Sequence, residues 1–185
     1  MLREAGGSIR DNVLLWDMAL DQIDPADQRQ IEIVVTGLPF ARGLPVAVDA
    51  TMVSVLHADG RPWDGATTKP GSSFGRAYKS KWRAYPELKD SATVRLVLAA
   101  AEVGGRLNQE SLELLDAAAQ CRAQHDPAVL RSQAARAWRA RWIGMIAVSA
   151  QDALAATLIQ EGLSILDAPA GTVPETAEVW IDGEL

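Results

Sequence analysis

Residues 31–56, IEIVVTGLPFARGLPVAVDATMVSVL, decide the fold of this chain. Two runs rich in Val and Ile, residues 31–35 and 45–56, flank a turn punctuated by glycine and proline, which predicts a β-hairpin. If the hairpin is symmetric, the numbers of opposed residues add up to about 81, and Glu32 then lies opposite Asp49. Their Cβ atoms would be about 5 Å apart, and like charges so placed destabilise a sheet. A divalent cation held by these carboxylates would compensate. An offset register, or an exposed Glu32 with Asp49 bonded to backbone amides, is the alternative.

Composition narrows the class of protein. The chain has 185 residues, 48% hydrophobic and 23% charged, which predicts one globular domain with a substantial core. One cysteine excludes an intrachain disulfide and a cysteine-based zinc site, and two histidines are too few for a histidine-rich metal centre. The net charge of −6 argues against capture of nucleic acid by charge alone. With no signal-peptide pattern and no run of 18 apolar residues, we expect an intracellular protein without a membrane partner.

The remaining sequence predicts an α/β domain at residues 1–162. Its sheet-containing core covers residues 1–106, a helical part covers 107–162, and an acidic, flexible tail covers 163–185. Within the core we expect the end of a truncated helix at 2–6, a strand at 9–18, a loop at 57–73, a helix at 74–85 and a buried strand at 94–101 that leads to Glu102.

The helical part begins with Asn108 as an N-cap, and a long second helix runs from 126 to about 160 and ends at Gly162. Arginines and tryptophans alternate along the second helix at Arg131, Arg136, Trp138, Arg139, Arg141 and Trp142. This pattern fits either a nucleic-acid grip with aromatic stacking or a solvated arginine face over a tryptophan core.

The predicted order, a clipped helix followed by β-β-β-α-β, resembles the αβββαβ core of restriction-endonuclease-like, or PD-(D/E)XK, nucleases. The resemblance implies a small mixed sheet with a Mg²⁺ or Mn²⁺ site, in which Glu32 replaces the usual first Asp and Asp49-Ala50-Thr51 stands at the (D/E)-x-K position. Clustered carboxylates suit such an ion, which polarises the scissile phosphate.

Thr51 departs from that motif, because the family has lysine there. Some members supply the lysine from the following helix, where Lys81 or Lys79 is available. The alternative is that both lysines lie on a solvated face. Glu102 is a candidate further metal ligand, or else it caps the adjacent Gly104-Gly105 turn.

A second resemblance covers most of the chain. The phrases IEIVVTGLP, LPVAVDATMVS, AYKSKWRAYPEL, AEVGGR and RWIGMIAVSAQDALAATL are similar to the C-terminal region of reverse-transcriptase polyproteins of LINE-type retrotransposons in protists. This implies an endonuclease module that nicks target DNA for insertion, an upstream reverse-transcriptase polypeptide and a nuclear location. The alternatives are a non-catalytic module of the same fold that binds nucleic acid or protein, and a decayed reading frame.

Overall fold

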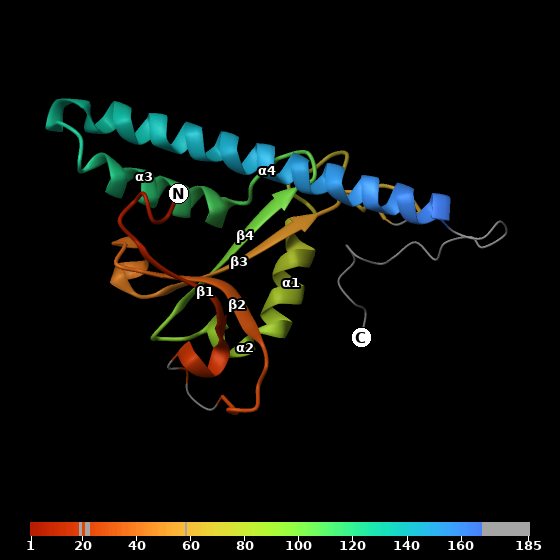
Figure 1. Ribbon diagram of the computed structural model, residues 1–185, viewed down its shortest axis with the longest axis horizontal. Coiled ribbons are helices and arrows are strands. Elements are labelled where there is room, and N and C mark those ends of the chain that lie inside the picture. Colours follow the sequence, from red (N-terminus) through yellow and green to blue (C-terminus); the bar gives the residue numbers. More distant parts are fainter. Residues whose placement is uncertain (19, 21–22, 58, 168–185) are drawn as a thin grey trace.

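A four-stranded mixed sheet organises the molecule (Figure 1). The computed structural model describes residues 1–18, 20, 23–57 and 59–167, with the backbone alone for 161–167. The strands lie in the order in which they follow along the chain: β1 (Ser8–Leu14), β2 (Gln30–Thr36), β3 (Val46–Val53) and β4 (Arg95–Glu102). β1, β2 and β3 pair antiparallel in succession, whereas β3 and β4 pair parallel.

The β2–β3 pairing confirms the predicted hairpin. Ile33 pairs with Val48 and Val35 with Val46, so opposed residue numbers add up to 33 + 48 = 81. The tight connection contains a short 3-10 turn, η2 (Phe40–Gly43), in which Ala41 and Arg42 adopt positive φ angles. The ladder ends at the Ile33–Val48 pair, and the next residues along the same register are Glu32 and Asp49, which the sequence predicted to lie opposite each other.

The helices connect and cover the strands. They are α1 (Phe74–Ala84), α2 (Pro86–Lys89), α3 (Gln109–Ala123) and α4 (Arg131–Asp167), with the short 3-10 turns η1 (Leu15–Met18) and η3 (Ala128–Leu130). Helix α1 lies in the crossover that parallel pairing of β3 and β4 requires. Asn108 caps α3 as predicted, since its side chain accepts a hydrogen bond from the Ser111 amide.

Alternate residues of the strands feed separate cores on the two sides of the sheet. Val46, Val48 and Val97 pack with α3 and with Trp142 of α4, whose side chain is fully buried. On the other side, Ala47 and Leu96 pack near α2, while Leu98 and Ala100 pack against Phe74 and Ala77 of α1. The molecule therefore has α1 and α2 on one face and α3 and α4 on the other, as Figure 1 shows.

The predicted α/β class, with a mixed sheet and a helical C-terminal half, is confirmed, but several boundaries differ. Residues before β1 form only one hydrogen-bonded turn, in which the Gly7 amide donates to the Leu2 carbonyl and the Gly6 amide to that of Arg3. This is the pattern that closes a helix C-terminus. The first strand ends at Leu14, and Gly162 does not end the long helix, which continues to Asp167. Within the predicted tail, residues 168–185 lie outside the described residues.

Candidate active site

Asp49 and Lys81 form an ion pair between β3 and α1. The Lys81 Nζ lies 3.0 Å from Asp49 Oδ2, and the Asp49 side chain is only 3% exposed while that of Lys81 is 25% exposed. Ala77, one turn earlier on α1, is buried against the sheet, so Lys81 extends from the sheet-facing side of the helix. Lys79 is exposed. Of the two candidate lysines, Lys81 is therefore the one that reaches the hairpin.

Glu32 joins this pair from β2. Its carboxylate accepts a hydrogen bond of 3.0 Å from the Ala50 amide, directly after Asp49. Its negative charge also contributes to raising the pKa of Lys81. The structure thus brings Glu32, Asp49 and Lys81 together from three elements. Unlike Asp49, Glu32 is exposed to solvent.

The electrostatics of the site keep Lys81 charged. Partial burial by itself lowers the pKa of Lys81, but the close contact with the Asp49 carboxylate and its charge, with smaller contributions from Tyr85 and Glu32, outweigh it and raise that pKa above its ordinary value. Burial, followed by the charge of Asp49, raises the pKa of the Tyr85 phenol. At neutral pH both groups therefore hold their protons, and the site presents a fixed ammonium group beside a buried carboxylate.

The Asp49 carboxylate has an oxygen that is poorly satisfied. Among the described residues, Oδ2 is buried and has no well-aligned hydrogen-bond donor, although Lys81 Nζ lies within ion-pair distance. The repulsion expected between Glu32 and Asp49 is therefore compensated here by a lysine. The sequence led us to expect a divalent cation in this role.

Arg29, which no sequence pattern singled out, braces the site. Its guanidinium lies 2.6 Å from carboxylate oxygens of both Asp27 and Glu87, and it donates to the Ala84 carbonyl at the end of α1. Tyr85 adds a hydrogen bond of 3.2 Å from its hydroxyl to the Gln30 carbonyl. These contacts fix the C-terminal end of α1 against the start of β2. The polar 21–30 connection carried no sequence signal that Arg29 would reach α1.

Glu102 lies apart from this group. In the parallel register it pairs with Val53, whereas Asp49 pairs with Leu98, so the two carboxylate residues differ by four positions, or about 13 Å of strand. Its Oε1 accepts a hydrogen bond of 2.5 Å from the Ser73 hydroxyl, and its Oε2 lies 3.6 Å from Arg106. The prediction that Glu102 joins the metal ligands is not supported by this placement.

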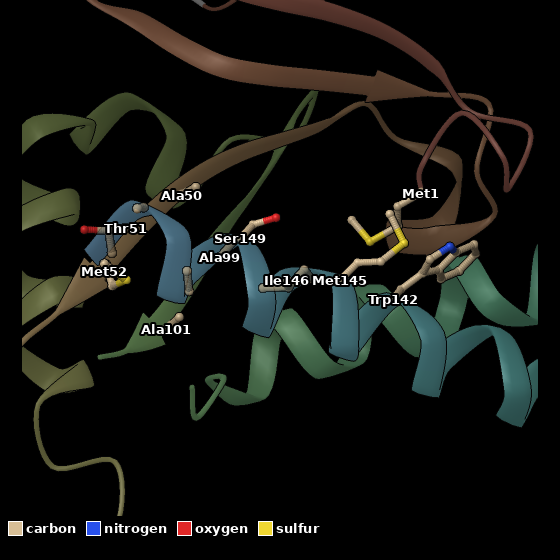
Figure 2. A pocket seen from close by; sticks show the side chains of 12 residues that line it. Met1, Ala50, Thr51, Met52, Ala99, Ala101, Trp142, Met145, Ile146 and Ser149 are labelled. Atoms are coloured by element: carbon tan, nitrogen blue, oxygen red, sulfur yellow. The ribbon is translucent and has the colours of Figure 1, made fainter. Parts of the chain in front are cut away.

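An apolar hollow lies elsewhere in the molecule. It has a volume of about 460 Å³ and an apolar lining that includes Ala99 and Ala101 of β4 together with Met145 and Ile146 of α4 (Figure 2). It therefore lies on the α4 side of the sheet, whereas Asp49 faces α1. Within the described ranges, no three or more His, Cys, Asp or Glu side chains gather closely enough to hold a metal ion.

Comparison with known proteins adds no family to this description. Models of protein families, curated protein sequences and solved structures gave no match to the chain. The resemblances described above therefore depend on the residues that carry them, and the roles of Glu32, Asp49 and Lys81 remain predictions.

Proposed function

We propose that this chain is a metal-dependent endonuclease module that nicks DNA, with Glu32 and Asp49 as metal ligands and Lys81 as the charge-stabilising cation. The supporting observation is that the three residues, chosen from sequence, converge from β2, β3 and α1, with Lys81 3.0 Å from Asp49. A role in retrotransposon insertion, an upstream reverse-transcriptase partner and a nuclear location are parts of the same proposal.

The donor set fits Mg²⁺ or Mn²⁺. Mg²⁺ keeps several waters and commonly takes only one or two protein carboxylates, with substrate phosphate oxygens completing its coordination. Asp49 offers a buried oxygen without a well-aligned donor, and Glu32 offers an exposed carboxylate. Such an ion, when bound, polarises the phosphate and makes a bound water more acidic.

The chain's own residues then have distinct tasks. Lys81 is kept protonated, so it can stabilise negative charge that develops on a phosphate but cannot accept a proton as a base. Tyr85 and Arg29 hold the end of α1 and thereby position Lys81. The exposed carboxylate of Glu32 marks the solvent-facing edge of the site, where a polymer backbone can approach.

One observation favours a second candidate, a non-catalytic module of the same fold that binds nucleic acid or protein. The Lys81 ammonium group already neutralises Asp49, and no third metal-ligating side chain joins the pair in the described part of the chain. In this candidate the ion pair holds α1 against the hairpin and no metal is bound.

A nicking assay separates the two candidates. Purified chain is incubated with supercoiled plasmid in Mg²⁺, Mn²⁺ or EDTA, and the Asp49→Asn variant is compared with Asp11→Asn. Asp11 is an exposed carboxylate on β1 that pairs with Arg3, and it is opposed to Ile33, which packs on the α3 side of the sheet. We expect nicking in either metal, none in EDTA, a loss of about 100-fold or more in Asp49→Asn, corresponding to about 2.7 kcal/mol of transition-state stabilisation, and little change in Asp11→Asn.

The other outcomes are equally definite. DNA binding without nicking supports the non-catalytic module, and the absence of both supports a decayed reading frame. Nicking that persists in Asp49→Asn would place the active site elsewhere.

A further inference from the structure

Helix α4 exposes an apolar surface that no part of the described chain covers. The helix spans Arg131–Asp167 and is about 55 Å long. Four of its large apolar side chains are substantially exposed: Met145 at 49%, Val148 at 61%, Leu158 at 59% and Ile159 at 64%. Figure 1 shows α4 extending past α3 and past the ends of β3 and β4. Exposed apolar surface of this kind marks a contact site.

Two of these residues, Val148 and Ile159, belong to a line of exposed residues along one side of the helix. Spacings of three or four positions place the following residues along one side of α4: Ala137, Arg141, Gly144, Val148, Asp152, Ala155 and Ile159. All of them are exposed. Trp142 and Ile146 lie on another side of the helix, where both line the hollow shown in Figure 2 and pack with the core. We call the exposed set the α4 stripe. Apart from Arg141, its first half is small, with alanine and glycine, and its second half contains the bulkier Val148 and Ile159.

The first half of α4 is basic and the second half is acidic. Residues 131–141 contain four arginines and residues 131–151 contain no acidic residue, whereas residues 142–167 contain Asp152, Glu161 and Asp167 without any lysine or arginine. A parallel pair of such helices would place like charges together. An antiparallel pair places the basic half of each helix beside the acidic half of the other.

We propose that α4 pairs antiparallel with α4 of a second copy of this chain through the α4 stripe. A register in which paired residue numbers add up to 293 sets Arg141 against Asp152 of the partner subunit, because 141 + 152 equals 293. The same register sets Met145, an exposed residue that directly follows Gly144 of the stripe, against the partner subunit's Val148. Each contact then occurs twice about a two-fold axis, as a closed symmetric dimer requires. The bulky second half of each stripe lies on the small first half of the other.

A second copy fits this surface better than a lipid bilayer does. By length and composition, residues 128–160 could cross a membrane, and very little of the most apolar window is buried. Arg141 and Asp152 lie within the stripe, however, and a bilayer would have to accommodate both charges. The antiparallel copy instead pairs each charge with its opposite. The inference does not depend on the proposed nuclease activity, because α4 lies on the sheet face away from Asp49 and Lys81.

Sedimentation of the full chain over a range of concentrations tests the proposal. We expect a monomer–dimer equilibrium that Val148→Glu shifts at least tenfold toward monomer, while Val129→Glu does not. Val129 is 87% exposed and precedes α4, so it is a matched valine outside the stripe. Circular dichroism establishes that each variant keeps its helical content. A monomer at all concentrations, equal effects of the two variants, or binding of the wild-type chain to phosphatidylcholine vesicles in place of self-association would each overturn the proposal.

Charge exchange tests the antiparallel orientation. Arg141→Glu and Asp152→Arg should each weaken self-association at least tenfold, since each homodimer then contains two like-charged contacts. An equimolar mixture of the two variants should form a heterodimer, because both of its 141–152 contacts are again between opposite charges. Arg141 also lies 3.9 Å from Glu4, so Asp152→Arg is the cleaner single variant. Failure of the mixture to associate more tightly than either variant alone would overturn the antiparallel arrangement.

Discussion

Two buried carboxylates face α1 from neighbouring strands, and the helix satisfies them in different ways. Asp49 is 2% exposed and meets the Lys81 ammonium group from the C-terminal half of α1. Glu102 is 7% exposed and meets the Ser73 hydroxyl directly before the first turn of α1, where the helix dipole also favours negative charge. Glu102 is thus held by a neutral donor, a helix N-terminus and a longer ion pair with Arg106, whereas Asp49 depends on one movable cation.

This difference makes Asp49 a candidate metal ligand and Glu102 a structural carboxylate. A metal ligand must give up its partner when the ion arrives. Lys81 can turn toward solvent on its flexible stem, because it is only partly buried. Ser73 is fully buried at the start of α1 and cannot move without the helix. We therefore expect Asp49 to exchange its lysine partner for a metal ion, and we assign a structural role to Glu102.

The largest expected effect comes from removing the cation. Lys81→Met should reduce the free energy of unfolding by about 2–4 kcal/mol, because it leaves the Asp49 charge buried without a partner. The double variant Asp49→Asn/Lys81→Met should recover most of that loss, since no charge then remains buried. Urea denaturation of the wild type, both single variants and the double variant gives the coupling free energy. A coupling below about 0.5 kcal/mol would show that the pair is effectively solvated.

A smaller effect is expected at Glu102. Glu102→Ala should cost about 1–3 kcal/mol, because the buried Ser73 hydroxyl loses its acceptor. Ser73→Ala is the matched variant and should cost a similar amount, while the two losses together should not add. Both variants should still nick DNA if the proposed function is correct. Loss of nicking in Glu102→Gln with unchanged stability would restore Glu102 to the catalytic site.

Stabilisation by metal should depend on Asp49 and not on Glu102. A metal that binds only the folded chain stabilises it by about 1.4 kcal/mol at ten times its Kd. We expect Mg²⁺ or Mn²⁺ to raise the melting temperature of the wild type and of Glu102→Gln but not that of Asp49→Asn. A rise that Asp49→Asn retains would show that the metal binds at another position.

Local patterns in the sequence were sufficient to predict the hairpin and the pairing of its ends. The turn between residues 36 and 45 fixes the β2–β3 register, and the next residues along this register after the Ile33–Val48 pair are Glu32 and Asp49. Lys81, one of the two lysines that the sequence offered from the following helix, lies one turn after the buried Ala77 and reaches Asp49. These inferences succeeded because each spans only a few residues on one element or across one turn.

The position of Glu102 was not predictable in the same way. It depends on the parallel register of β3 and β4, which a long loop, α1 and α2 separate along the chain. No local period relates the two strands, so the distance between Asp49 and Glu102 could not be read from sequence. The end of α4 also escaped prediction, because a single glycine at 162 costs a long helix only about 1 kcal/mol and does not terminate it.

A third carboxylate, that of Glu110, is partly buried and has weaker partners than the first two. It lies in the first turn of α3 and accepts one hydrogen bond of 3.0 Å, from the Leu98 amide of β4. Burial raises the pKa of Glu110 above its ordinary value of 4.5, although the Leu98 amide and Arg95 act in the opposite direction. The negative charge of Glu110 therefore has weaker partners than the charges of Asp49 and Glu102.

The direction of the pH effect follows from that raised pKa. Protonated Glu110 favours the folded state, so its contribution to stability is complete below pH 4.5 and is lost as the pH rises through its higher pKa in the folded chain. Glu110→Gln keeps an acceptor for the Leu98 amide and removes the titration. Its free energy of unfolding relative to the wild type should therefore increase between pH 4 and pH 7. A difference that stays constant over this range would show that the Glu110 side chain remains solvated in the folded protein.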